Sequence, residues 1–120
     1  MKINEKYGAF TKAELFNISQ GVGCRLFKDL DDNTVFTVEA AVFMMDELVN
    51  PETGETKEKE ILHIKTVDGV YTTESPTVIR TFRAAVQFME DYRLTFKLLR
   101  GKSKNNRPFM DLQLFEAQEA

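Results

Sequence analysis

One helix interrupts a chain of strands at residues 75–89, which read SPTVIRTFRAAVQFM. Ser75 is a residue type that caps helix N-termini, and Pro76 follows at the first helical position, where the missing N–H is not needed. Apolar side chains then recur at helical spacing on one face, at Ile79, Phe82, Ala85, Val86 and Met89. We therefore predict an amphipathic helix over about 76–92.

Three strands are predicted before this helix. Residues 12–27 hold apolar residues broken by two glycines, which is typical of a strand with a bulge or a bend. Residues 34–48 are β-branched and aromatic, and apolar side chains fall on both of their faces. Residues 58–73 alternate as a third strand, with a hairpin or bulge signal at Asp68-Gly69.

Two more strands are predicted after the helix, at 94–100 and 107–116, joined by a polar turn. The order of three strands, one helix and two strands is that of an OB-fold. We predict a mainly β protein, a five-stranded OB-fold (Greek-key) barrel with one α-helix between strands 3 and 4. Residues 1–120 are expected to form a single domain. A β-sandwich with one helix is an alternative that the same pattern allows.

Composition argues against several classes of function. The chain has one cysteine, Cys24, and one histidine, His63, so it offers neither an internal disulfide nor a zinc-ligand cluster. Neither a signal peptide nor a stretch of roughly 20 apolar residues stands out. No nucleophile with a nearby base is evident. We expect a cytoplasmic protein that is not an enzyme, binds no cofactor or metal and does not enter a membrane.

The most informative segment is 93–109, RLTFKLLRGKSKNNRPF, which holds six basic residues and no acid in a chain of net charge −3. Phosphate attracts such a cluster without any reading of sequence. Phe109 lies at the base of the turn, and basic residues interleaved with aromatics are typical of single-strand binding. The alternative is a solvated hairpin whose lysines protect a strand edge.

Other candidates come from the earlier strands. Lys28 follows Phe27 just before a turn. Phe43 and Lys65 would lie together on an outer sheet surface of the kind that OB-folds use for oligonucleotides, if the face bearing Phe43 points outward. The pattern does not say which face of 34–48 is the core. Tyr71 can stack on a base or cover the end of the barrel.

Acidic residues gather at 46–60, where six carboxylates stand against two lysines. This composition is typical of a solvated hairpin tip. The tip could also repel DNA and confine it to the basic side.

Three stretches together carry a resemblance to a known family. They are 15–34, LFNISQGVGCRLFKDLDDNT; 68–71, DGVY; and the region from Phe96 to Leu114 around the Gly101-Lys-Ser turn. In this order they resemble the single-stranded DNA-binding proteins of small protein-primed Bacillus phages. The resemblance implies a protein that covers displaced single strands, with Phe27, Lys28 and Tyr71 matching residue by residue. The tyrosines of the family's second strand are absent here, and Phe43 stands in that region.

We therefore expect sequence-independent binding of single-stranded DNA during phage replication, by capture on basic residues and stacking on exposed rings. Phage replication proteins are further candidate partners, and monomer and dimer both stay open. The rival hypothesis is a protein-binding OB module, or an inhibitor of a host protein, that acts through residues 46–60. The candidate nucleic-acid-binding residues are Lys28, Phe43, Lys65, Tyr71, Arg93, Lys97, Arg100, Lys102, Lys104, Arg107 and Phe109.

Overall fold

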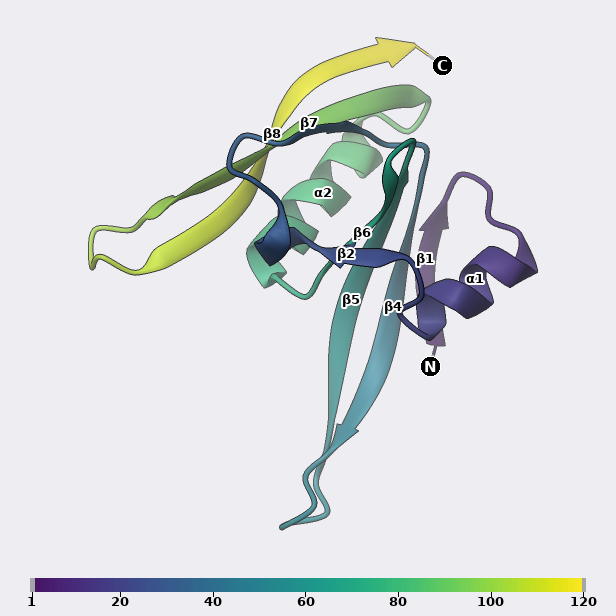
Figure 1. Ribbon diagram of the computed structural model, residues 1–120, viewed down its shortest axis with the longest axis vertical. Helices are drawn as coiled ribbons and strands as arrows, with labels where there is room; N and C mark the ends of the chain where they lie inside the picture. Colours follow the sequence, from purple (N-terminus) through teal and green to yellow (C-terminus); the bar gives the residue numbers. More distant parts are fainter. Residues whose placement is uncertain (1, 120) are drawn as a thin grey trace.

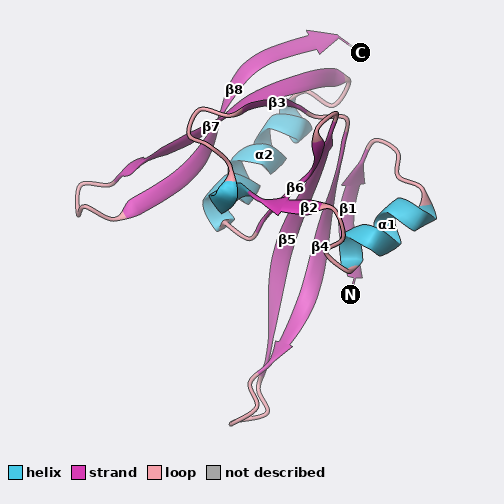
Figure 2. Ribbon diagram, in the orientation of Figure 1, coloured by secondary structure: helices cyan, strands magenta, loops and turns pink. Residues whose placement is uncertain are grey.

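The computed structural model describes residues 2–119, which form two β-sheets, two α-helices and one short 3-10 helix (Figures 1 and 2). The larger sheet has the strand order β1-β4-β5-β6-β2, and the smaller one has the order β3-β7-β8. The prediction of a mainly β protein is confirmed. The strands are β1 (Lys2–Tyr7), β2 (Cys24–Leu26), β3 (Val35–Thr37), β4 (Ala40–Val49), β5 (Thr56–Thr66), β6 (Gly69–Thr73), β7 (Tyr92–Lys102) and β8 (Pro108–Glu119).

The predicted strand over 34–48 divides into two strands that serve different sheets. β3 pairs antiparallel with β7, whereas β4 pairs with β1 and β5. The two residues between them mark the crossing, because Val38 N–H donates to the Leu94 carbonyl (2.9 Å) and Glu39 N–H donates to the Lys65 carbonyl (2.8 Å). One bent segment therefore links the sheets.

Over residues 2–119 the two sheets do not close into a barrel, and eight strands form where we predicted five. At one side β6 pairs in parallel with β2, with Cys24 opposite Val70 and Leu26 opposite Thr72. At the other side β8 pairs with β7 alone. The larger sheet thus ends at β2 and the smaller sheet at β8, and these two strands do not pair, which leaves an open seam between them over residues 2–119.

The prediction of a strand over 12–27 is wrong for most of its length. Residues Lys12–Ser19 form α1, and only β2 is extended. The helix begins with a capping box, in which Glu14 N–H donates to Thr11 Oγ1 (3.0 Å) and Thr11 N–H donates to Glu14 Oε1 (2.9 Å). Gly21 and Gly23, both at positive φ, then turn the chain into β2.

The helix predicted after Ser75 is confirmed as α2 (Pro76–Phe88), with Val78 N–H donating to Ser75 Oγ (3.3 Å). It ends before Tyr92 because Met89 has left helical geometry (φ −131°, ψ 61°) and β7 begins at Tyr92. Its buried face lies in the core between the two sheets (Figure 1).

Aromatic side chains join the sheets through α2. Phe82 of α2 contacts Phe43 of the larger sheet and Phe96 of the smaller sheet, with ring centroids 6.0 and 5.4 Å apart. Phe36 of β3 lies 6.0 Å from Phe96. All four rings are almost fully buried. The face of residues 34–48 that bears Phe43 is therefore the core face.

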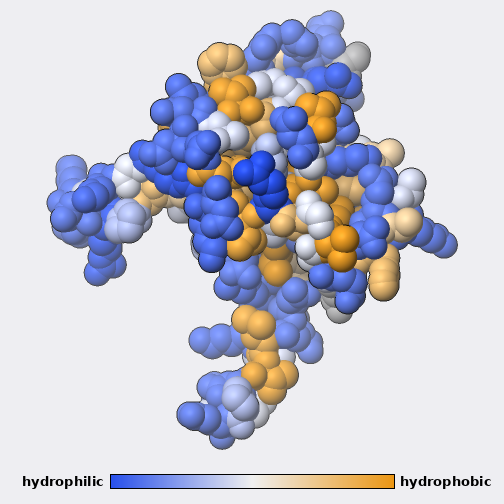
Figure 3. All heavy atoms as spheres, viewed as in Figure 1, coloured by the Kyte–Doolittle hydropathy of each residue, from blue (hydrophilic) through white to orange (hydrophobic). Residues whose placement is uncertain are grey.

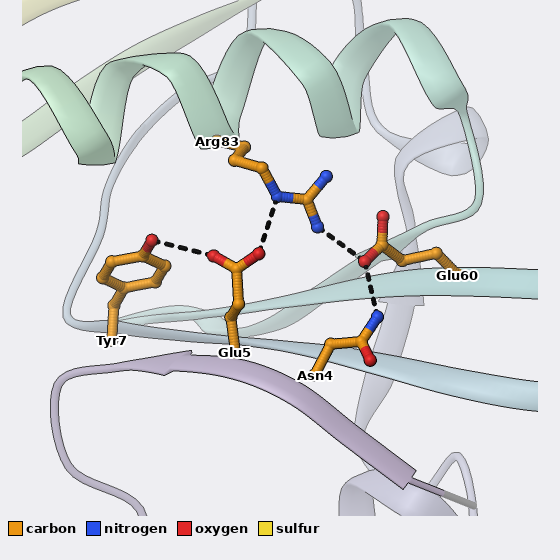
Figure 4. A network of polar contacts seen from close by, with 5 residues as sticks. All are labelled: Asn4, Glu5, Tyr7, Glu60 and Arg83. Atoms are coloured by element: carbon orange, nitrogen blue, oxygen red, sulfur yellow. Dashed lines mark hydrogen bonds and ion pairs between the residues drawn. The ribbon is translucent and has the colours of Figure 1, made fainter.

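A polar network links α2 to strands β1 and β5 of the larger sheet (Figure 4). Arg83 of α2 pairs with Glu5 of β1 (3.0 Å) and Glu60 of β5 (2.5 Å), and Asn4 donates to Glu60 (3.0 Å). Tyr7 donates its hydroxyl to Glu5 (2.9 Å). Burial raises the pKa of Glu60, but the bonds from Arg83 and Asn4 outweigh burial and hold that pKa below its ordinary value.

Candidate nucleic-acid interface

The end of the β7–β8 hairpin, residues 99–110, projects from the body of the molecule and is called here the basic arm (Figure 1). Its turn is closed by Asn106 N–H donating to the Ser103 carbonyl (2.8 Å), with Asn106 at positive φ (60°). The arm carries four basic residues and no acid: Arg100, Lys102, Lys104 and Arg107. Figure 3 shows its end covered by hydrophilic side chains.

One aromatic ring is held in place on this arm. Phe109 lies directly opposite Gly101 in the β7–β8 ladder. A Cβ added at Gly101 would lie 2.9 Å from Cε1 and Cζ of Phe109, so the ring rests against the glycine. The side chain is still 47% exposed. The glycine thus supports a ring that is open to solvent, which is the element that base stacking needs.

Lys97 lies further along the same face of the smaller sheet as Phe109. Residues Phe96 and Leu98 point into the core, so Lys97 points outward by alternation. It stands opposite Val35 on β3 and Gln113 on β8, both exposed. The outer face of the smaller sheet therefore carries a further cation, separated from the arm by the pair of Leu99 and Asp111.

The cations of this region differ in their partners. Over residues 2–119, the ion pairs involve none of Arg93, Lys97, Lys102, Lys104 and Arg107. All of these except Lys97, which is half-buried, are exposed. Most of the predicted cluster is thus available to an anionic ligand.

Arg100 is held by the protein. Its Nη2 donates to the Phe27 carbonyl (2.6 Å), and its Nη1 pairs with Asp32 (2.7 Å). Lys28, next to Phe27 in the 3-10 helix η1 (Phe27–Asp29), is exposed. The arm therefore contacts η1, so the candidate residues Arg100 and Lys28 lie in neighbouring segments.

The expectation of exposed rings at Phe43 and Tyr71 is wrong, because they are only 0% and 3% exposed. Phe43 packs on Phe82, as described above. Tyr71 packs edge-on against Phe27 (6.2 Å) and Phe36 (5.5 Å) in the core. Guanidinium groups also lie over the two rings, that of Arg83 at 4.4 Å from Phe43 and that of Arg25 at 5.9 Å from Tyr71, so neither ring is free for a base to stack on.

The sheet surface around Lys65 is covered as well. Lys65 pairs with Glu14 of α1 (2.6 Å), which lowers the pKa of that carboxyl. Ile18 of α1 packs on Val42 and Met44, the outward side chains of β4. The prediction that this face is open to an oligonucleotide is therefore wrong, because sequence reasoning missed the helix that lies on it.

His63 lies on the same covered face and is buried. Its Nδ1 and Thr72 Oγ1 are 2.8 Å apart. Burial lowers the pKa of His63 to about 4, so the ring is neutral at pH 7. We assign it to packing beneath α1.

Two residues of the site were missed from the sequence, Gly101 and Asp32. A signal for Gly101 existed, because a glycine inside a strand pattern marks a close approach of other atoms. No comparable signal marks Asp32, which lies 68 positions from Arg100.

Within residues 2–119, no group of three or more His, Cys, Asp or Glu side chains is placed to hold a metal ion. The helices of this part of the chain are too short and too polar to cross a membrane.

Comparison with known proteins found no matching family model, no matching curated protein and no matching solved structure.

Proposed function

We propose that this protein binds single-stranded DNA without sequence preference and coats it. The observation that carries the proposal is the basic arm, on which exposed cations surround one ring supported by Gly101. Phosphates would follow the cations, and a base would stack on Phe109. Such a protein is not an enzyme. It protects single strands and removes hairpins because it binds single-stranded DNA and not the duplex.

The connectivity supports an OB-type origin of the fold. If β3 and β4 count as one bent strand, the chain runs through that strand, β5, β6, α2, β7 and β8. The bent strand pairs with both β5 and β7, as the first strand of such a barrel does. OB-folds are partly open barrels. In this interpretation the seam between β2 and β8 is the open part, because β2 is added to the sheet at the edge of β6.

We further propose a role in phage replication, which rests on the resemblance described above. Of its matching positions, Phe27 and Tyr71 are core residues here and Lys28 is exposed. Stacking in this chain is therefore assigned to Phe109.

The test is a titration of labelled oligo-dT at two salt concentrations. Replacing Lys102, Lys104 and Arg107 together by alanine should weaken binding and reduce the salt slope by up to about two, since each phosphate contact on a single strand contributes roughly 0.7. The matched control replaces Lys2, Lys6 and Lys12, which are equally exposed and lie at the other end of the chain. Equal effects of the two triple variants would remove the arm from the site.

A second candidate function is binding to a basic protein partner through residues 46–60, called here the acidic arm. The β4–β5 hairpin carries these residues away from the body (Figure 1), and Leu48 and Val49 are exposed on it. A native gel with poly-dT discriminates the two candidates, because only the first predicts a shifted band that the basic-arm variant loses.

A further inference from the structure

Arg100 differs from the other cations of the basic arm because the protein already orients its guanidinium. The contact with the Phe27 carbonyl joins one amino group to a backbone atom, and the contact with Asp32 joins the other to a carboxylate. The Asp32 side chain is 69% exposed, against 24% for Arg100. The first contact is an anchor, and the second is a solvent-facing ion pair that another anion can replace.

We propose that Asp32 occupies on Arg100 the position that a phosphate of the bound strand takes. The proposal rests on the single-strand function and specifies how that site is regulated. Carboxylate and phosphate are both oxyanions that accept from the planar guanidinium fork. Binding then exchanges one oxyanion for another, while the Phe27 carbonyl keeps the guanidinium in place. Asp32 both holds the side chain ready and lowers the affinity for DNA.

A cleft beside Arg100 has room for the nucleotide attached to that phosphate. It has a volume of about 350 Å³ and lies at the open seam. Phe27 belongs both to its wall and to the Arg100 anchor, and Met110 of its wall stands directly opposite Arg100 in the ladder. The lining includes Leu26, Phe27, Lys28, Thr73, Ser75 and Met110.

The chemistry of this cleft suits a base. Leu26 and Met110 supply apolar contact, and the hydroxyls of Thr73 and Ser75 supply polar contact. Lys28 provides a second cation. The one carboxylate of the lining, Glu74, is paired with Lys59 (2.6 Å). A nucleotide placed here would put its base at the seam and its phosphate on Arg100.

The first experiment compares Asp32→Asn with Asp31→Asn by fluorescence anisotropy of labelled oligo-dT at physiological ionic strength. The two variants remove the same charge from the same loop, and over residues 2–119 the Asp31 side chain has no ion pair. Asp32→Asn should raise the affinity about two- to fivefold, the range of an exposed ion pair. Asp31→Asn should give less than half of that gain.

A double-mutant cycle then assigns the gain to Arg100. In an Arg100→Gln background, Asp32→Asn should give no more gain than Asp31→Asn. Equal gains from the two aspartate variants, or a gain from Asp32→Asn that survives without Arg100, would overturn the proposal. A wild-type protein that binds no oligo-dT would instead overturn the proposed function, so the two failures are distinguishable.

The last experiment separates a nucleotide from a bare phosphate, with inorganic polyphosphate as the second probe. Asp32→Asn should strengthen binding of both probes, whereas Leu26→Ser should weaken oligo-dT alone. Val67→Ser is the control, because Val67 is an exposed residue in the turn between β5 and β6. If Leu26→Ser is unfolded, Met110→Gln carries the same test. If Leu26→Ser lowered the affinity for both probes equally, or for neither, the cleft would not be the binding site of a base.

Discussion

Two hairpins leave the body of this protein in different directions (Figure 1), and they carry opposite charges. The basic arm has four cations and no acid, and the acidic arm has six carboxylates and two lysines, so their net charges are +4 and −4. The overall charge of −3 hides this separation. A ligand responds to the local field, so an acidic protein can still present a site for nucleic acid.

The arms also differ in how their strands face each other. In the basic arm, the two cations within the strand register face uncharged residues: Arg100 is opposite Met110, and Lys102 is opposite Pro108. In the acidic arm, Glu47 stands directly opposite Glu58. Like charges opposite each other destabilise a sheet. The ladder of the basic arm thus has no like-charge pair, whereas that of the acidic arm has one at Glu47 and Glu58, next to an attractive pair of Asp46 and Lys59.

The largest expected effect tests whether stacking belongs to the arm or to the core. Tyr71→Ala should lower the free energy of unfolding by about 3–5 kcal/mol, because it removes a buried ring. Tyr71→Phe should cost little, and the folded fraction of both variants should keep its affinity for oligo-dT. Melting temperature and affinity are measured on the same preparations. If the Tyr71→Ala variant were stable but had lost its affinity for oligo-dT, Tyr71 would be a residue that stacks on a base.

The body between the arms should be sensitive to acid through His63. Its pKa of about 4 in the folded protein lies below the ordinary value of 6.5, so the unfolded chain binds the extra proton first as pH falls. This contribution is complete above pH 6.5 and is lost toward pH 4, and it amounts to about 3 kcal/mol.

His63→Gln should flatten the fall in stability between those two pH values, as measured by urea unfolding. Glu14 and Glu60, whose pKa values are lowered, titrate in both proteins and cancel in the comparison. Parallel curves for the two proteins would contradict a buried neutral imidazole.

Next in size is the ring on the basic arm. Phe109→Ala should cost about 1–3 kcal/mol in binding to oligo-dT, with little dependence on salt. Gly101→Ala leaves charge and ring unchanged but forces the ring off its support, and should lose part of the same affinity. Phe115→Ala is the matched control, since Phe115 is an exposed ring on the same strand away from the arm. If Phe115→Ala lowered the affinity for oligo-dT as much as Phe109→Ala, Phe109 would not be the specific stacking residue.

The smallest effect sharpens the comparison of the two arms. Glu58→Lys replaces a repulsive cross-strand pair with an attractive one and should raise stability by about 0.5 kcal/mol. Glu55→Lys makes the same charge change outside the strand pairs and serves as the control. Equivalent changes in the free energy of unfolding would show that Glu47 and Glu58 do not interact.

Local signals predicted α2 and the basic arm well. The cap at Ser75 and the polar turn at 101–106 each act over a few residues. Which face of residues 34–48 points to the core could not be predicted from the sequence, because both faces are buried. Phe43 faces the core, and Val42 and Met44 lie under α1. Alternation specifies a face only where one side is wet. The sequence does contain the capping box of Thr11 and Glu14 that begins α1, but the two glycines after it are equally typical of a bend in a strand.

In the candidate site, the cations of the arm were visible in sequence and their partners were not. Whether Arg100 meets Asp32, or Lys65 meets Glu14, depends on pairings between distant segments. The same holds for the seam, whose position depends on β2 joining β6 in parallel.

The place of α1 in the chain has a consequence for synthesis. The helix and Phe10 cover the outer apolar face of β4, and without them that face would be an exposed apolar patch prone to aggregation. Proteins leave the ribosome N-terminus first. The cover therefore emerges before the strands that it shields, and α1 is already present when the β4–β5 hairpin is synthesised.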